Sequence, residues 1–161
     1  MTKERLFIYK KESLQKILRE KKEQGSKVVF TNGCFDVLHI GHIRLLSAAK
    51  GAGDILVVAL NSDESIRRIK DQTRPIVPLL ERAEIIASLR DVDFVTSFDE
   101  ETPLEIIGYL KPDIIVKGGD YHIDDVVGKD IVLSYGGEVK LFPYIDGLST
   151  SNIIRKIQEL R

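Results

Sequence analysis

Residues 27–50 read KVVFTNGCFDVLHIGHIRLLSAAK, and this stretch decides the fold. Lys27–Thr31 is rich in β-branched residues, which is typical of a buried parallel strand. Asn32–Asp36 then predicts a tight loop, and His39–Lys50 predicts a helix that ends at Gly51. The stretch therefore predicts a strand followed closely by a helix, which is the repeating unit of an α/β protein.

The same alternation continues along the rest of the chain. Further strands are predicted at 54–60, 93–96, 113–117 and 138–142. Further helices are predicted at 13–24, at 62–70, from Pro78, from Thr102, at 130–135 and at 150–160. For the helix that starts near Thr102, the spacing to Glu105 predicts a capping box, with Pro103 in the first helical position. Because crossovers between parallel strands are right-handed, the alternation predicts a single Rossmann-like, doubly wound parallel sheet of about five strands with helices on both faces.

The composition predicts one domain. The 161 residues are 43% hydrophobic and 30% charged, enough for a single core. We therefore expect one domain over 1–161, with a leading amphipathic helix in 1–26 and the core of the domain in 27–161. The 24 basic and 25 acidic residues leave a net charge of -1, which argues against a nucleic-acid-binding face but allows a local phosphate pocket.

The cellular location is predicted from what the sequence lacks. Cys34 is the only cysteine, so no intrachain disulfide can form and a secreted disulfide scaffold is excluded. The start of the chain has no apolar stretch of the kind found in signal peptides, and the longest apolar runs have the length of strands. These features predict a cytoplasmic protein that does not enter a membrane.

Two loops carry the most unusual residues of the chain. Ligands of doubly wound sheets bind beyond the carboxyl ends of the strands, where the strand order reverses. With a strand order of 3-2-1-4-5, the loops after the first and fourth strands flank that crevice. The first loop leads into His39-Ile-Gly-His42, and the second begins with Lys117-Gly-Gly-Asp120. We therefore expect the functional site between them.

The two histidines predict a phosphate-binding site. Three-residue spacing places His39 and His42 on one face of the first helical turn. A helix N-terminus also offers free N–H groups and the positive end of the helix dipole, and Gly41 permits close approach of a ligand. Two alternatives stay open: an ordinary helix with two solvated histidines, or a zinc site in which Cys34 or Asp36 is the third ligand. The sequence has no Cys-x-x-Cys pair to support the zinc site.

Further candidates lie at the other predicted loops. Gly118 and Gly119 permit close backbone contact with a nucleotide beside Lys117, and Asp120 is placed to meet its ribose or base. The alternative is a glycine turn with a solvated charge pair. Hydroxyl groups that can bind phosphate cluster at the start of the last predicted helix, where one of them is also expected to be the N-cap. These are Ser149, Thr150 and Ser151.

The motif Thr31–His42 resembles the signature of the cytidylyltransferase-like nucleotidyltransferases. Within that superfamily, four further segments are similar to the adenylyltransferase domains that form ADP-heptose, and the resemblance covers about residues 27–157. These segments are Asn61–Asp63, Arg74-Pro75, Val116–Tyr121 and Asp146–Ile154. The HxGH element is shared by enzymes with many substrates, whereas the combination of Lys-Gly-Gly-Asp-Tyr with Asn-Ser-Asp is more specific.

The resemblance implies an enzyme that transfers AMP from ATP to a sugar 1-phosphate, heptose 1-phosphate, and releases pyrophosphate during lipopolysaccharide biosynthesis. It implies Mg²⁺ bound with ATP, no protein metal site and, since relatives of this size often pair, a homodimer. Many relatives are fused to a sugar kinase, so the chain is expected to be a stand-alone version. The alternatives are a CTP-dependent cytidylyltransferase acting on glycerol 3-phosphate or a similar alcohol phosphate, and a nucleotide-binding module without activity.

The implied site has three catalytic residues and a larger set that binds the nucleotide and its phosphates. The catalytic residues are His39, His42 and Lys117. The binding set is Thr31, Asn32, Gly33, Cys34, Phe35, Gly41, Asn61, Asp63, Arg74, Gly118, Gly119, Asp120, Ser149, Thr150 and Ser151. Asp36 is expected to be structural, orienting the helix start or a histidine, and Cys34 to pack rather than react. No general base is needed, because a sugar phosphate is already substantially ionised near neutral pH.

Overall fold

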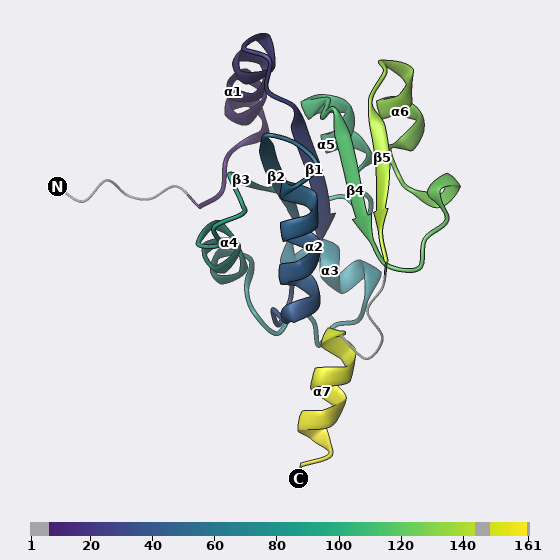
Figure 1. The fold of residues 1–161 in the computed structure, drawn as a ribbon. Helices are drawn as coiled ribbons and strands as arrows, with labels where there is room; N and C mark the ends of the chain where they lie inside the picture. The colour runs from purple at the N-terminus through teal and green to yellow at the C-terminus, as the bar shows by residue number, and fades with distance from the viewer. Residues whose placement is uncertain (1–6, 144–148, 161) are drawn as a thin grey trace, which may run out of the picture.

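The computed structural model describes residues 7–143 and 149–160, and its centre is a five-stranded, all-parallel sheet (Figure 1). The strands are β1 (Val28–Gly33), β2 (Ile55–Asn61), β3 (Phe94–Phe98), β4 (Ile114–Gly118) and β5 (Glu138–Phe142). Their spatial order is β3-β2-β1-β4-β5. The predicted Rossmann-like fold class is therefore confirmed. The observed strand order is the one supposed above for placing the crevice, and it reverses between β1 and β4.

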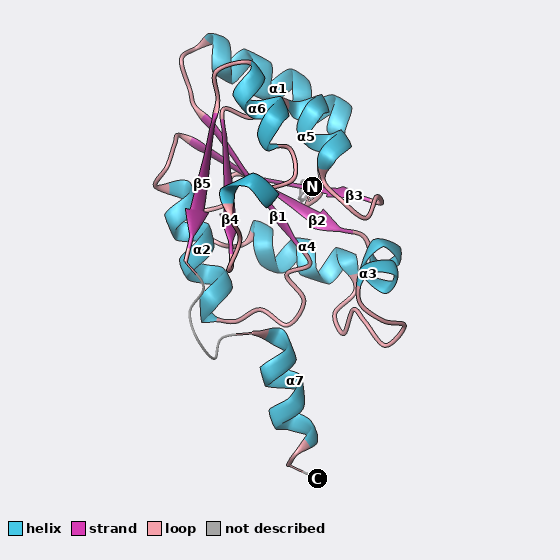
Figure 2. Ribbon diagram, turned by 90° about the vertical axis from the view of Figure 1, so that its right-hand side faces the viewer, coloured by secondary structure: helices cyan, strands magenta, loops and turns pink. Residues whose placement is uncertain are grey.

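Helices cover both faces of the sheet (Figure 2). They are α1 (Lys11–Glu23), α2 (Ile40–Lys50), α3 (Asp63–Ile69), α4 (Leu79–Ala87), α5 (Leu104–Leu110), α6 (Lys129–Ser134) and α7 (Thr150–Gln158), with a 3-10 turn at Ile123–Asp125. α1, α5 and α6 pack on one face, whereas α2 and α4 pack on the other. Because all five strands are parallel, the loops after β1 and β4 leave the sheet at the same edge.

Two apolar cores hold these layers together. Successive residues of β1 point to opposite faces, so Phe30 joins the core under α1 and α5, and Val29 joins the core under α2 and α4. Every residue of β2 is buried, as expected for a central strand covered on both sides. The rigid sheet fixes where the loops at its carboxyl edge begin.

Two local predictions are corrected by the structure. β1 continues to Gly33, which pairs with Leu60 of β2, so the loop after it begins at Cys34 rather than at Asn32. The helix near Thr102 forms, but the capping box does not. α5 starts at Leu104 with Pro103 as its N-cap, and no side chain caps it. Thr102 lies one residue before the cap position, so its hydroxyl is too far back to reach the free amides.

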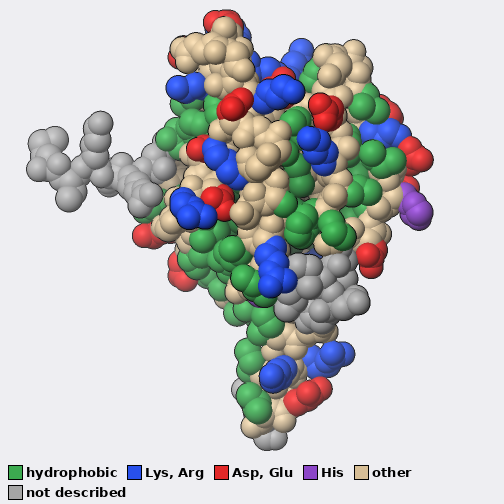
Figure 3. Space-filling view, viewed as in Figure 1, with side chains coloured by type: hydrophobic (Ala, Val, Ile, Leu, Met, Phe, Trp, Pro, Cys, Tyr) green, Lys and Arg blue, Asp and Glu red, His purple; other side chains and the backbone are tan. Residues whose placement is uncertain are grey.

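α7 extends away from the rest of the molecule (Figures 1 and 2), and none of its residues is fully buried. Thr150 Oγ1 ties its first turn to the body by donating to the carbonyl of Asp36 (2.6 Å). The Asp146-Gly-Leu part of the last predicted motif lies in 144–148, outside the described residues. Within 7–143 and 149–160, no helix combines the length and apolar character needed to cross a bilayer. Basic and acidic side chains are interspersed on the face shown in Figure 3.

Candidate active site

A cavity of about 580 Å³ opens at the carboxyl ends of β1, β4 and β5. It lies where the strand order reverses, as the doubly wound fold predicts. Most of the candidate residues from the sequence lie on its wall: Cys34, Phe35, His39, Gly41, His42, Arg74, Gly118, Gly119, Asp120, Ser149, Thr150 and Ser151. Segments far apart in the sequence therefore meet around one space.

His39 and His42 lie side by side at the start of α2. Their rings are stacked, with centroids 3.8 Å apart and planes inclined by 27°. His39 is the N-cap, and its Nδ1 accepts from the backbone N–H of Gly41 (3.1 Å). His42 Nδ1 accepts from the backbone N–H of His39 (3.3 Å). The two imidazoles thus form a reciprocal capping box, a role usually filled by hydroxyl and carboxyl side chains.

This capping arrangement assigns the protons of both rings. Because each Nδ1 accepts a hydrogen bond, each neutral ring carries its proton on Nε2 and can donate it to a ligand. Burial lowers the pKa of His39. Burial, with a smaller contribution from His39, lowers the pKa of His42 to about 4. At neutral pH the pair therefore presents two neutral N–H donors, because protonation of Nδ1 would remove the acceptors that cap α2.

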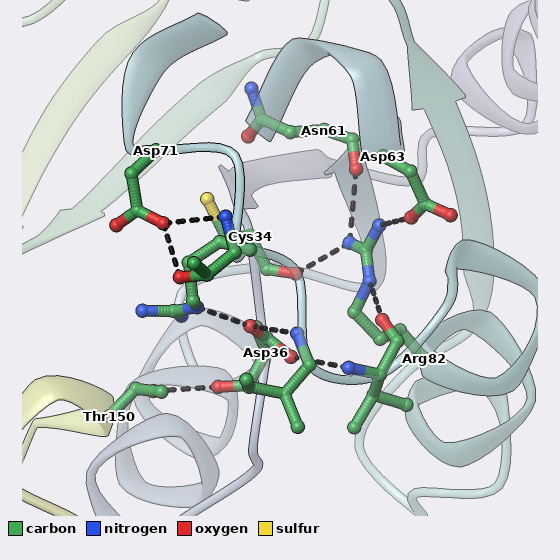
Figure 4. Close-up of polar contacts among 11 residues, drawn as sticks. Cys34, Asp36, Asn61, Asp63, Asp71, Arg82 and Thr150 are labelled. Carbon is green, nitrogen blue, oxygen red and sulfur yellow. Dashed lines mark hydrogen bonds and ion pairs between the residues drawn. The ribbon is translucent and has the colours of Figure 1, made fainter. Parts of the chain in front are cut away.

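Asp36 organises the loop that precedes the histidines (Figure 4). Its carboxylate accepts from Arg74 Nε (2.7 Å) and from the backbone N–H groups of Ile76 and Val77 (both 2.9 Å). Burial alone raises the pKa of Asp36, but these hydrogen bonds together hold it below its usual value. Asp36 is structural, as expected, but it orients Arg74 and the 74–77 loop rather than a histidine. The hydrogen bond from Arg74 Nε to Asp36 fixes the Arg74 guanidinium at the cavity wall.

The residues on either side of Asp36 adopt an uncommon backbone conformation. Phe35 has φ 46° and Val37 has φ 53°, both in the left-handed region. This region is unfavourable for a β-branched residue such as Val37. The contacts of Asp36 hold the segment in this conformation, because its carboxylate and its carbonyl are both hydrogen-bonded to other parts of the chain.

Arg82 is a residue that the sequence analysis missed. Only 1% exposed, it joins four segments from inside the protein (Figure 4). Nε donates to the carbonyl of Val77 (2.9 Å), and Nη1 donates to the carbonyls of Cys34 (2.7 Å) and Asn61 (3.0 Å). Nη2 pairs with Asp63 (2.7 Å). The available sequence signal was its position on the inward face of α4, beside Ala83 and Ile86.

A second cavity of about 260 Å³ adjoins the first, and its wall includes Lys117, Asn32 and Asn61. Both cavities share Cys34, Lys70 and Tyr121 as lining residues. Lys117 therefore lies on the wall of the smaller cavity and not on that of the larger one, which contains the histidines. Burial lowers the pKa of Lys117, and its Nζ lies 5.3 Å from the centroid of the Tyr121 ring.

Three candidates line neither cavity. Thr31 is fully buried within the sheet, and Gly33 packs so closely against Phe35 that an added Cβ would lie 3.1 Å from its ring. Asp63 pairs with Arg82.

At the last helix, Ser149 is the N-cap and accepts from the N–H of Asn152 (3.1 Å). Ser149 and Thr150 thus have protein partners, as well as positions on the wall of the larger cavity.

The site offers little for a protein-bound metal. Among residues 7–143 and 149–160, no group of three His, Cys, Asp or Glu side chains converges. The zinc alternative therefore lacks a third ligand there. Burial also raises the pKa of Cys34, which disfavours the thiolate that zinc requires.

Known proteins resemble the chain over most of its length. Residues 30–156 match the cytidylyltransferase-like family. "Bifunctional protein HldE" of Syntrophotalea carbinolica is 55% identical over 91% of this chain and 30% of its own length. HldE of Geobacter metallireducens is 54% identical over 91% of this chain and 30% of its own. The chain thus spans about 30% of the length of these curated relatives.

Two solved structures resemble the fold. The lipopolysaccharide core biosynthesis protein of Thermoplasma volcanium is 31% identical, with a TM-score of 0.62 over 75% of this chain and 98% of that one. Pantoate-beta-alanine ligase of Francisella tularensis is 19% identical, with a TM-score of 0.62 over 92% of this chain and 77% of that one, and shows a likeness of fold alone. With the family match over residues 30–156, these findings confirm the resemblance drawn from Thr31–His42: the chain belongs to the cytidylyltransferase-like family of nucleotidyltransferases.

Proposed function

We propose that the chain transfers AMP from ATP to heptose 1-phosphate, giving ADP-heptose and pyrophosphate. The observation that carries this proposal is the stacked pair His39 and His42, which presents two neutral Nε2–H donors at the N-terminus of α2 inside the larger cavity. Donors of this kind suit a reaction in which negative charge must be stabilised without removal of a proton.

The proposed step is a single in-line displacement. An ionised oxygen of the sugar phosphate attacks the α-phosphorus of ATP, and the bond from that phosphorus to the oxygen bridging to the β-phosphate breaks. The electron pair of that bond leaves with pyrophosphate, so no proton has to move. His39 and His42 donate to the triphosphate, while Arg74 supplies a fixed positive charge at the same wall.

The choice of ATP and heptose rests on the resemblance of Asn61–Asp63 and Val116–Tyr121 to domains that form ADP-heptose. The high identity to HldE supports it, as does the likeness to a lipopolysaccharide core biosynthesis protein. The family itself is described by cytidylyl transfer, which favours CTP as the second candidate nucleotide. The test must therefore compare both nucleotides.

Several associated properties belong to the same proposal. Mg²⁺ would be bound with ATP and would supply positive charge to the triphosphate. Asp36 would not hold it, since its carboxylate already accepts from Arg74, Ile76 and Val77. The enzyme works in the cytoplasm, where ATP and sugar phosphates are found, and it forms a homodimer.

Pyrophosphate release is the direct test. We expect release in Mg²⁺ only when ATP and heptose 1-phosphate are both present, and no release with CTP. His42→Ala should lower kcat by roughly a hundredfold, or about 3 kcal/mol, because it removes one stabilising donor. His122→Ala, at an exposed histidine outside both cavities, is the matched control.

The other outcomes separate the alternatives. Release that depends on CTP and glycerol 3-phosphate would make the chain a cytidylyltransferase. ATP binding without release for any acceptor would make it a binding module. Unchanged kcat in His42→Ala would remove the histidine pair from the mechanism.

A further inference from the structure

Lys117 is a partly buried cation without an anionic partner. No described residue accepts a hydrogen bond from its ammonium group or forms an ion pair with it. The ammonium group lies over the ring of Tyr121. Burial disfavours an unpaired charge, so the pKa of Lys117 is lowered. An anion bound in the smaller cavity would provide the missing partner.

Asn61 faces the same cavity with a free acceptor. Its side chain is buried, with 4% exposure for the residue, and Nδ2 donates to Ser65 Oγ (3.0 Å). Ser65 Oγ gives its own proton to the carbonyl of Glu100 (2.7 Å), so it must accept from Asn61, which fixes the orientation of the amide. No described residue donates to Asn61 Oδ1. Among the described residues, only Thr31 Oγ1 is a fully buried side-chain atom without a partner, so Asn61 Oδ1 is open to the cavity and can accept from a ligand that brings a hydroxyl group.

The outer wall of the cavity adds more acceptors. Glu101 and Asp125 line it with exposed carboxylates, and Thr102 lies beside Glu101. A wall with two lysines, Lys117 and Lys70, at its inner side and several acceptors at its outer side matches a molecule that carries an anionic group and a series of hydroxyl groups. It does not match a second nucleotide, whose triphosphate would meet these carboxylates.

We propose that this smaller cavity binds the acceptor substrate, with its phosphate at Lys117 and Asn32 and its hydroxyl groups at Asn61 and the Glu101–Asp125 wall. The proposal rests on the proposed function and divides the site into two parts. The triphosphate occupies the larger cavity with the histidines, and a phosphorylated polyol occupies the smaller one. Because Cys34, Lys70 and Tyr121 border both cavities, the acceptor phosphate lies next to the phosphate it attacks.

Equilibrium binding by calorimetry tests this division without turnover. The probes are heptose 1-phosphate, glycerol 3-phosphate, inorganic phosphate and an ATP analogue with a methylene group between its α- and β-phosphorus atoms. Lys117→Gln should weaken the binding of heptose 1-phosphate, glycerol 3-phosphate and inorganic phosphate by about tenfold or more, because a charge-assisted hydrogen bond is lost. The ATP analogue should change by about twofold at most. His42→Ala should give the reverse pattern.

Matched variants separate a binding defect from a folding defect. Lys117→Arg keeps the charge and should retain most of the affinity for the phosphate probes. Lys16→Gln removes the same charge from an exposed position on α1 and should change nothing. Asp125→Ala, at the exposed wall, should weaken heptose 1-phosphate by about threefold while leaving inorganic phosphate unchanged, since only the sugar brings hydroxyl groups.

Failure of this inference is distinguishable from failure of the proposed function. If wild type binds glycerol 3-phosphate through Lys117 but not heptose 1-phosphate, the acceptor cavity stands and the heptose assignment falls. If Lys117→Gln weakens the ATP analogue as much as the phosphate probes, or if no phosphate probe binds wild type, the acceptor cavity is wrong. Pyrophosphate release in that case would still support the transferase.

Discussion

Arg82 bonds to wall residues of the cavities from inside the protein, whereas Lys117 lies on the wall of the smaller cavity, and the described residues provide hydrogen-bond acceptors only for Arg82. Arg82 is bonded to three backbone carbonyls and to Asp63, and it is sealed from solvent (Figure 4). Lys117 contacts the Tyr121 ring and has no described acceptor. One cation therefore belongs to the framework of the site, whereas the other is kept available for a ligand.

The same contrast separates the two ends of the site. Near the histidines, Asp36, Arg82 and the capping bonds of His39 and His42 fix the donors before any ligand arrives. Such preorganisation lowers the cost of reorganisation during the reaction. Near Lys117, its ammonium group and Asn61 Oδ1 have no hydrogen-bond partner among the described residues, and in our proposal the ligand provides these partners. Substitutions at the first end should cost stability, and substitutions at the second should cost affinity.

Removing each cation in turn tests the contrast between Arg82 and Lys117 directly. Arg82→Met should lower the free energy of unfolding by about 3 kcal/mol, because Asp63 and three carbonyls lose a buried partner. Lys117→Met should stay within about 1 kcal/mol of wild type or be more stable, since it removes an unpaired charge. Urea denaturation measures both. Equal losses in the two variants would show that Lys117 is also part of the framework.

The stability of the protein should depend on pH through His42. Because the folded pKa of His42 is lowered to about 4, the unfolded chain binds more protons between that value and the ordinary pKa of 6.5. Stability is therefore fully present above about pH 6.5 and is lost as the pH falls toward 4. Allowing for partial exposure, we expect a loss of about 1 to 2 kcal/mol from this residue.

Denaturation curves measured between pH 4 and 7 test this dependence. His42→Gln should flatten the slope over that range, because glutamine does not titrate. His122→Gln, at an exposed position outside both cavities, should retain the slope of wild type. A slope in His42→Gln as steep as in wild type would mean that other groups cause it.

The sequence predicted the parallel sheet, because alternating strands and helices leave few topologies open, and, for the supposed strand order, the meeting of two loops. It also predicted that His39 and His42 share one helical face, since that depends only on spacing. These features follow from local pattern and from the handedness of crossovers.

The sequence could not predict which residues each polar side chain contacts. Asn61 and Asp63 lie two residues apart and were expected to bind the same nucleotide. Asn61 ends β2 and faces the smaller cavity, whereas Asp63 begins α3 and pairs with Arg82 of α4. The direction of each side chain depends on how the strand turns into the helix, and the partner comes from a distant segment. The division of the site into two cavities depends on the same tertiary contacts.

The smallest predicted effect tests how far the fixed end extends. α7 contributes Thr150 to it through the hydrogen bond to the carbonyl of Asp36. Thr150→Val keeps the shape but removes the donor, so the free energy of unfolding should fall by about 1 kcal/mol. Amide hydrogen exchange in α7 should become faster, and the ATP analogue should bind more weakly, because Ser149 and Ser151 share the cavity wall. Ser134→Ala, at an exposed hydroxyl on α6, is the control. Faster exchange without weaker nucleotide binding would place α7 outside the preorganised framework, and the contrast between the two ends would then rest on Asp36 and Arg82 alone.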